Sequence, residues 1–217
     1  MSKSEGVIKF RMDFVEAAAL TAVQLTEINA WRKVLVIMGM IGQTPERYDN
    51  YGFGNISRRL LADELPGYDH PFVISGTQTG GVADLAPEHY ATVLWCRPAE
   101  NHVSAQGPMR PSSESMTHGV VYEMDSRINW VFHAHDPYIW QQRVALDLPT
   151  TADGVPYGSP EMSAEVGRLF RETEVAQRGI FAMGGHVDGI VTFGATAEEA
   201  GSVLLHHLAS AIRLSYS

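Results

Sequence analysis

Short segments rich in β-branched and aromatic residues constrain the fold of this 217-residue chain more than any other feature. The segments GNISRRL, PFVISG and YATVLWC are separated by Gly, Pro and Asp, which are typical turn residues. Further strands are predicted at 129–135 and on both sides of the turn in GIFAMGGHVDGIVTFG. Because these strands do not alternate regularly with helices, the pattern favours a mixed α/β chain, with an antiparallel or mixed sheet flanked by helices, over a doubly wound fold.

Helical periodicity predicts the layers on either side of this sheet. Asp13 is followed three residues later by Glu16, as at a helix start, and apolar residues then recur at helical spacing as far as Ile28. This pattern predicts a long first helix. Further helices are expected at 113–124, 160–173 and 195–214. The chain has no internal repeat and no low-complexity linker, so one domain over residues 1–217 is predicted.

Charge and hydropathy exclude several classes of function. The net charge of -9 argues against a nucleic-acid-binding surface or a polybasic membrane contact, yet it allows a local pocket for an anionic metabolite. The longest apolar stretch, VLVIMGMIG, is far below the roughly 20 residues of a membrane-spanning helix. The opening MSKSEGVIKF lacks the apolar core of a secretory signal, and the single cysteine, Cys96, rules out an internal disulfide. We therefore expect a cytoplasmic protein.

The segment NWVFHAHDP places two histidines on an otherwise apolar strand. Side chains two residues apart on a strand point to the same face, so His133 and His135 can direct their rings at one cation. His186 is a candidate third ligand, because Gly184 and Gly185 before it let the backbone pass close to a site. The alternative is a pair of core histidines and an ordinary turn histidine. The remaining histidines are expected on the surface or on helices.

The segment MRPSSESMTHG precedes a predicted helix and combines hydroxyls with a carboxylate. Ser112 and Ser113 would lie at the helix start, where backbone amides and the positive end of the helix dipole favour a phosphate or carboxylate. The alternative is a simple N-cap, with Ser113 as the capping residue. Glu114 beside a metal can act as a ligand or as a general base, whereas a solvated first-turn glutamate would have no chemical role.

Two glycine-rich segments offer further donors to an anion. In GFGNISRR, backbone amides and Asn55 are candidates, although a turn that enters a strand has the same composition. In VISGTQTGG, Ser75 and Gly76 are candidates, with an ordinary turn at a strand end as the alternative. We expect a single anion pocket to which the following residues contribute: Asn55, Ser75, Gly76, Ser112 and Ser113.

Taken in order, these motifs resemble the class II aldolase/adducin family, which contains the fuculose-phosphate and ribulose-phosphate aldolases. The resemblance extends from about residue 52 to residue 194 and comprises Gly-Asn-Ile-Ser with an arginine, Ser75-Gly76, Ser112-Ser113-Glu114, His133-Ala134-His135, and Gly185-His186 ending in DGIVTFG. It implies a class II aldolase-like three-layer fold, with a central mainly antiparallel sheet flanked by helices. It also implies a homotetramer with active sites at the subunit boundaries.

The resemblance assigns roles to these residues. In catalytic members three histidines bind zinc or a similar divalent ion, which implies that His133, His135 and His186 are metal ligands. Zinc suits imidazole, and manganese, iron, cobalt or nickel could occupy the same site. Glu114 corresponds to the acid/base residue. The substrate phosphate is held at the Asn, Gly and Ser positions, here Asn55, Gly76, Ser112 and Ser113.

The predicted activity is that of a metal-dependent lyase that cleaves or forms a carbon-carbon bond in a small hydroxy-ketone, which we expect to be phosphorylated. The metal would stabilise an enediolate while Glu114 moves a proton. The same groups would also support a dehydratase, an epimerase or a decarboxylase. The alternative to an enzyme is a non-catalytic adducin-like binding module. Such a module would be indicated by the loss of metal ligands.

Overall fold

The computed structural model describes residues 7–68 and 70–216 and is built around an eight-stranded sheet. In spatial order the strands are β1-β5-β4-β3-β2-β6-β8-β7. Among these described strands, β1 and β5 form the only parallel pair, so the prediction of a mixed, mainly antiparallel sheet is confirmed. The strands are β1 Arg11–Glu16, β2 Asn55–Arg59, β3 Phe72–Ser75, β4 Tyr90–Arg97, β5 His102–Gly107, β6 Trp130–His135, β7 Ile180–Ala182 and β8 Gly189–Gly194.

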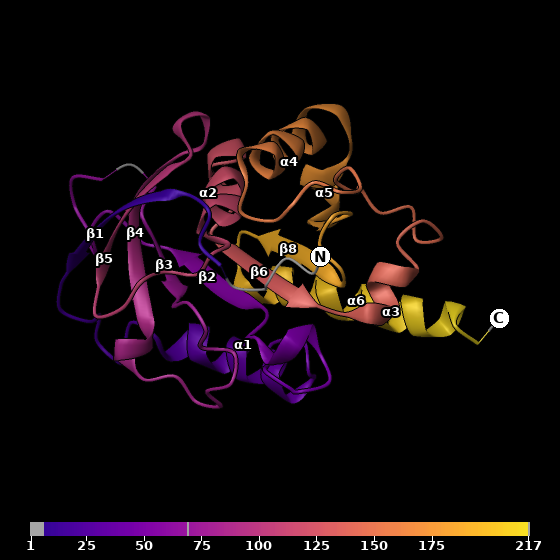
Figure 1. The fold of residues 1–217 in the computed structure, drawn as a ribbon, viewed down its shortest axis with the longest axis horizontal. Coiled ribbons are helices and arrows are strands. Elements are labelled where there is room, and N and C mark those ends of the chain that lie inside the picture. Colours follow the sequence, from indigo (N-terminus) through magenta and orange to yellow (C-terminus); the bar gives the residue numbers. More distant parts are fainter. Residues whose placement is uncertain (1–6, 69, 217) are drawn as a thin grey trace.

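Helices cover both faces of the sheet, which makes it the middle of three layers (Figure 1). Helices α1, α3 and α6 lie on one face, and α2, α4 and α5 lie on the other. The three helices predicted after residue 110 are confirmed, with ends that differ by at most two residues. The helices are α1 Thr26–Ile37, α2 Ser115–Met124, α3 Pro137–Gln141, α4 Pro160–Glu172, α5 Val175–Arg178 and α6 Ala197–Leu214.

Strand β6 shows how the sheet separates two hydrophobic cores. Trp130, Phe132 and Ala134 pack into the core on the α1 and α6 side. Val131 belongs to the core beneath α2 and α4. This alternation is the two-residue period of a strand. His133 follows Val131 on the α2 side, so the central strand delivers a polar side chain to that face where the apolar core ends.

The predicted long first helix is wrong in its first half. Arg11–Glu16 forms β1, an edge strand that pairs in parallel with β5, and the helix begins only at Thr26. Asp13 Oδ2 lies 2.9 Å from His102 Nε2 on β5, so this carboxylate contacts the neighbouring strand. Pairing with β5 supplies backbone hydrogen bonds and overrides the local helix-start signature. Ile28 is fully buried in α1, as the later part of the pattern predicts.

Strand β5 and the short helices α3 and α5 were not predicted. Strand β5 is short, and although Val103 and Ala105 alternate with the polar Ser104 and Gln106, its apolar positions are few and small. Helix α3 has a local signal, because Asp136 Oδ1 accepts a hydrogen bond of 2.8 Å from Ile139 N and Pro137 occupies the first helical position. Short 3-10 turns occur at Tyr48–Asn50, Pro87–His89 and Pro98–Glu100.

None of the helices in the described part of the chain combines the length and the apolar character of a membrane span. The opening segment, for which the sequence predicts no secretory signal, lies partly outside the described residues, because these start at residue 7.

Candidate metal centre and anion recess

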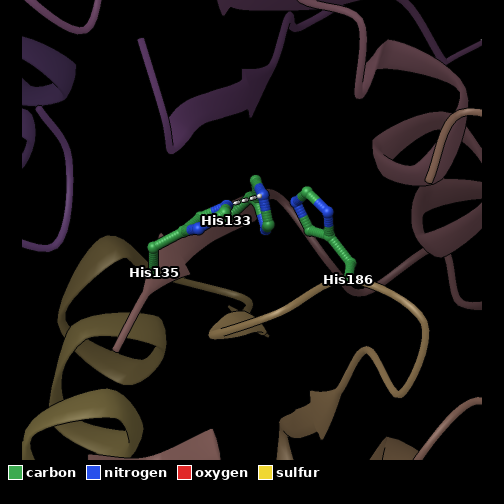
Figure 2. A group of neighbouring side chains, drawn as sticks. All are labelled: His133, His135 and His186. Carbon is green, nitrogen blue, oxygen red and sulfur yellow. Dashed lines mark hydrogen bonds between the residues drawn. The ribbon is translucent and has the colours of Figure 1, made fainter. Parts of the chain in front are cut away.

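Three histidines from two parts of the chain meet beside the end of β6 (Figure 2). His133 and His135 belong to β6, and His186 lies in the turn between β7 and β8. Their exposed fractions are 1%, 1% and 5%. One ring nitrogen from each histidine lies within 4.8 Å of the other two. The fold therefore brings together the three side chains that the sequence marks as candidate metal ligands.

The ring nitrogens are spaced as ligands of one ion would be. His133 Nε2 and His135 Nε2 are 3.1 Å apart. Two ligands at about 2.0–2.1 Å from a tetrahedral zinc ion would be separated by about 3.3 Å. The rings of His133 and His186 stack with their centroids 5.2 Å apart, and the ring of His135 stands edge-on to His186. This donor set fits a divalent cation that accepts imidazole nitrogen.

Burial keeps these imidazoles in the form that binds metal. Desolvation, followed by the nearby His186, holds the pKa of His133 and of His135 well below the ordinary histidine range. Both rings are therefore neutral at physiological pH. A metal ion binds neutral imidazole and competes with protons for it, so a low proton affinity favours occupancy of the site near neutrality.

The turn that carries His186 depends on the two glycines before it. A Cβ at Gly184 would clash with the carbonyl oxygen of Thr151, and a Cβ at Gly185 would clash with the backbone of Val155. The close approach expected at these glycines is therefore present, and the backbone they approach is the 151–155 loop. His186 N donates a 3.2 Å hydrogen bond to the carbonyl of Met183, which closes the turn.

A polar cluster that the sequence did not reveal supports His135. The ring of Tyr48 packs edge-on against His135 with centroids 4.6 Å apart, and its hydroxyl donates a 2.6 Å hydrogen bond to Asp188 Oδ2. Arg47 Nη2 donates to the Tyr48 hydroxyl at 2.7 Å and to the carbonyl of His135 at 3.2 Å. Burial, and then the hydrogen bond to Asp188, raises the pKa of Tyr48. No periodicity identifies these residues, and of the three only Asp188 falls within a quoted motif, DGIVTFG.

A narrow polar recess lies next to the histidines. Asn55 on β2 is directly opposite His133 on β6, and in an antiparallel pair such residues project to the same face. Asn55 is only 6% exposed, and its Oδ1 has no hydrogen-bond partner among the described residues. The recess is lined by Gly52, Gly54, Asn55, Gly76, Thr77, Gln78, Thr79, Gly80, Ser112, Ser113 and Glu114.

Most of the residues predicted for the anion pocket line this recess, but their local roles differ from the expected ones. Neither serine is the N-cap of α2, which is Glu114; Ser112 Oγ accepts a 3.2 Å hydrogen bond from Glu114 N just before the helix. Ser113 is 4% exposed and lines the recess. Ser75 does not line it, since its Oγ accepts a hydrogen bond from Ile56 N at 3.3 Å. Gly52 and Gly54 belong to the segment whose backbone amides were candidates, whereas Thr77 to Gly80 were not expected at the site.

Glu114 lies at the base of α2 as a buried carboxyl group that faces the recess. It is 2% exposed, and Thr117 Oγ1 donates a 2.9 Å hydrogen bond to its Oε2. This hydrogen bond restricts the rotation of the side chain. A solvated first-turn glutamate, the alternative considered from sequence, does not describe this position. The carboxyl group therefore shares a recess with the backbone amides and hydroxyls of the predicted anion pocket.

Two of the remaining histidines are also buried. His118 on α2 is fully buried, and its Nδ1 lies 2.7 Å from Ser57 Oγ. His102 on β5 is 7% exposed and contacts Asp13. A helix position was expected for His118, but not its complete burial. His102 lies on a strand, so the prediction of a surface or helix position is wrong for this residue.

Buried imidazoles directed at one point, beside a recess of amides, hydroxyls and one carboxyl group, define an α/β protein suited to hold a divalent cation next to a small polar ligand. Residues 44–213 match the model of the class II aldolase and adducin N-terminal domain, and the chain belongs to this family. Sequence comparison with curated proteins finds no match.

Solved structures share the fold at low sequence identity. A sugar-phosphate aldolase from Thermotoga maritima is 18% identical with a TM-score of 0.65, and the match covers 89% of this chain and 94% of that one. L-fuculose-1-phosphate aldolase from Thermus thermophilus is 20% identical with a TM-score of 0.63, covering 90% and 94%. YgbL from Escherichia coli, assigned provisionally to aldolase, epimerase or decarboxylase chemistry, is 16% identical with a TM-score of 0.63, covering 89% of each chain. These likenesses establish the three-layer fold.

Proposed function

We propose that this chain is a metal-dependent class II aldolase-type lyase that cleaves or forms a carbon-carbon bond in a small, phosphorylated hydroxy-ketone. The observation that carries this proposal is the position of the histidine cluster beside the recess, fixed by the pairing of Asn55 with His133. A cation site, a buried carboxyl group and donors to an anion are thereby joined in one site. Each group corresponds to one requirement of the proposed reaction.

His133, His135 and His186 would hold the cation, with zinc the metal we propose on the basis of three buried imidazoles. When bound there, a divalent cation supplies Lewis acidity that polarises adjacent oxygens of a hydroxy-ketone. The chain contributes the orientation of the ligands. Strand β6 fixes two of them, and the Gly184-Gly185 turn fixes the third.

Glu114 is the residue we propose for proton transfer. In a retro-aldol cleavage, a hydroxyl proton leaves as the neighbouring carbon-carbon bond breaks, and a proton is then returned to the carbon that carried the bonding electrons. A buried carboxyl group held by the hydroxyl of Thr117 is positioned to accept and return such a proton. Asn55, Gly76, Ser112 and Ser113 would orient the anionic end of the substrate, since amides and hydroxyls donate to phosphate oxygens.

Dehydration, epimerisation and decarboxylation use the same types of group, and we keep them as alternatives within the family. A non-catalytic adducin-like module would require neither the ligands nor the carboxyl group. The burial of His133, His135 and His186 as one cluster supports an enzyme, as does a buried Glu114 in the recess that Asn55, opposite His133, also lines.

The test combines elemental analysis of the purified protein with a screen of phosphorylated ketoses and hydroxy acids, with products identified by NMR. We expect about one divalent ion per chain, and release of an aldehyde from a phosphorylated ketose. A product that retains every carbon of the substrate would favour dehydration or epimerisation. Release of carbon dioxide would favour decarboxylation. A metal-free protein without turnover would contradict the proposal and favour the adducin-like module.

We also propose a cytoplasmic location and a homotetramer. The absence of a possible disulfide, with Cys96 as the single cysteine, agrees with a reducing compartment. Exposed apolar side chains close to the metal centre support assembly. Val187, next to His186, is 59% exposed, and Tyr138 at the start of α3 is 50% exposed.

A further inference from the structure

The recess contains no cationic side chain of its own. Its lining consists of glycines, Asn55, Gln78, hydroxyl-bearing residues and Glu114, with neither Lys nor Arg among the described residues that form it. The whole chain also carries a net charge of -9. An anionic ligand in this recess would lie beside a carboxyl group, so a source of positive potential is needed nearby.

Arg32, on α1, lies behind one wall of the recess. It is 2% exposed, and its Nη2 donates 2.8 Å hydrogen bonds to the carbonyls of Thr79 and Val82. Its Nη1 donates to the carbonyl of Ala83 at 3.3 Å. Three carbonyls of the loop after β3 therefore converge on one buried guanidinium.

No carboxylate within the described ranges forms an ion pair with Arg32. The carboxylate that acts on the pKa of Arg32, after burial and Tyr90, is Asp84, whose side chain is 79% exposed and pairs with Lys33 Nζ at 2.7 Å. Burial lowers the pKa of Arg32, but an arginine side chain starts so far above neutrality that it keeps its proton. The positive charge of Arg32 beside the recess is therefore balanced by carbonyl dipoles, and no buried anion among the described residues pairs with it.

The hydrogen bond to Arg32 orients the Thr79–Gly80 peptide, so that the Gly80 N–H can act as a donor in the recess. In a trans peptide the carbonyl and the following N–H point in opposite directions. Because the carbonyl of Thr79 points to Arg32, the N–H of Gly80 points away from Arg32, and Gly80 lines the recess. The Gly80 N–H meets no acceptor among the described residues. Only glycine fits at this position, since a Cβ would lie 2.9 Å from Gly52 Cα and 3.0 Å from Phe53 N.

We propose that Arg32 is the positioning residue of the recess: it holds the Thr79–Gly80 peptide with its N–H toward the ligand, and it gives the recess its preference for an anion over a neutral group. This inference rests on the proposed function, in which the recess binds the anionic end of the substrate. A charge inside the protein is screened less by water and salt than a surface charge. One buried cation can therefore outweigh the distant acidic groups of the surface.

The test is a titration of the metal-loaded protein with inorganic phosphate, followed by calorimetry. Arg32→Met removes the charge and keeps most of the side-chain volume, and we expect phosphate affinity to fall about tenfold or more. Lys33→Met is the matched control, because it removes one charge from the next position of the same helix, where the side chain is 42% exposed. We expect less than about a twofold change for this control. Arg32→Lys keeps the charge and should restore part of the affinity.

The role in positioning is separated from simple destabilisation by two further measurements. Metal content should stay unchanged in all variants, and the effect of Arg32→Met should persist at about 0.3 M NaCl, where surface charges are screened. In the unmodified protein, phosphate should shift the amide proton resonance of Gly80 strongly downfield. This last experiment needs no variant, so it can overturn the inference even if Arg32→Met fails to fold.

Ser113→Ala distinguishes failure of this inference from failure of the proposed function. Loss of affinity in Ser113→Ala, with affinity unchanged in Arg32→Met, would place phosphate in the recess and overturn the role of Arg32. An unshifted Gly80 amide at saturating phosphate would overturn it as well. Phosphate binding that neither variant weakens, or no phosphate binding by the unmodified protein, would remove the anion recess and the inference together.

Discussion

At the scale of single residues, this site depends on side chains that are costly to bury alone. Three imidazoles and one carboxyl group lie at 5% exposure or less. Removing polar groups from water is unfavourable unless another partner replaces the water. A shared cation would replace water for the imidazoles, and the hydroxyl of Thr117 does so for one oxygen of Glu114. We therefore expect replacement of a histidine to affect metal binding and replacement of Glu114 to affect turnover.

Replacement of His133 by Ala should abolish stoichiometric metal binding, because a site with three protein ligands loses most of its metal affinity when one of them is removed. His135→Ala and His186→Ala should behave in the same way. Elemental analysis after dialysis measures the effect, and His206→Ala on the exposed surface of α6 is the control. Full metal content in all three site variants would refute the assignment.

Replacement of Glu114 by Gln should leave fold and metal content intact and reduce turnover by at least about a hundredfold, the usual contribution of a general acid or base. The amide oxygen of Gln can still accept the hydrogen bond from Thr117, so the packing is preserved. Steady-state kinetics on the substrate found by screening gives the result. Glu123→Gln, at the exposed end of the same helix, should be unaffected. Equal turnover in Glu114→Gln and the unmodified enzyme would exclude the acid/base role.

At the scale of elements, α2 joins the recess to the centre of the sheet. Just before its first turn, Ser112 Oγ accepts a hydrogen bond from Glu114 N, and within the helix His118 is buried against Ser57 of β2. Tyr122, one turn further, contacts the same hydroxyl at 2.7 Å. This polar ladder fixes how α2 sits on β2 and therefore where Glu114 lies.

Because His118 is buried at this contact between α2 and β2, the free energy of unfolding should depend on pH. Burial lowers the pKa of His118 from its usual 6.5 to about 3, so the unfolded chain takes up a proton more readily than the folded one. The stabilisation is fully present above about pH 6.5 and is lost as the pH falls toward 3. Below pH 6.5 the free energy of unfolding should decrease by about 1 kcal/mol per pH unit more steeply in the unmodified protein than in His118→Gln.

Urea unfolding of the metal-free protein at several pH values, from about 4.5 to about 7.5, measures this slope. His206→Gln is the matched control, because this exposed histidine should not change the slope. Identical pH profiles for the unmodified protein and His118→Gln would show that His118 is protonated without cost in the folded state.

At the scale of the whole molecule, both hydrophobic cores share one sheet. Strand β6 contributes Phe132 to one core and Val131 to the other. Disruption of one core would therefore destabilise the strands that also form the other core. Unfolding in urea should follow a single transition, with tryptophan fluorescence and far-UV circular dichroism giving the same midpoint. Two separate midpoints would contradict the single domain predicted for residues 1–217.

Assembly is the second prediction at this scale. From the apolar stretch VLVIMGMIG, Val34 and Ile37 are 38% and 76% exposed, whereas Leu35 and Met40 are buried. Together with Val187 near the metal centre, these side chains favour coverage by further copies of the chain. Light scattering should give the mass of four chains at micromolar concentration. A monomer mass across a hundredfold range of concentration would refute the homotetramer.

The sequence by itself determined the local parts of this protein. The two-residue period of β6 places His133 on the α2 side of the sheet after Val131, and helical periodicity gives α4 and α6 nearly to the residue. Glycines before His186 indicate a close backbone approach, which the clash of an added Cβ confirms. These features depend on neighbours in the chain, and local backbone geometry is sufficient to predict them.

Only the tertiary structure decided the rest, because the deciding contacts join residues far apart in sequence. The segment with Asp13 becomes a strand because β5 is available to pair with it. Ser75 bonds the backbone of β2 and does not line the recess, although adjacent Gly76 does. In the sequence, Arg32 is indistinguishable from an ordinary helix residue. Only the tertiary structure brings the carbonyls of the loop after β3 to its guanidinium. The burial that gives these residues their properties exists only after long-range packing, so no local pattern encodes it.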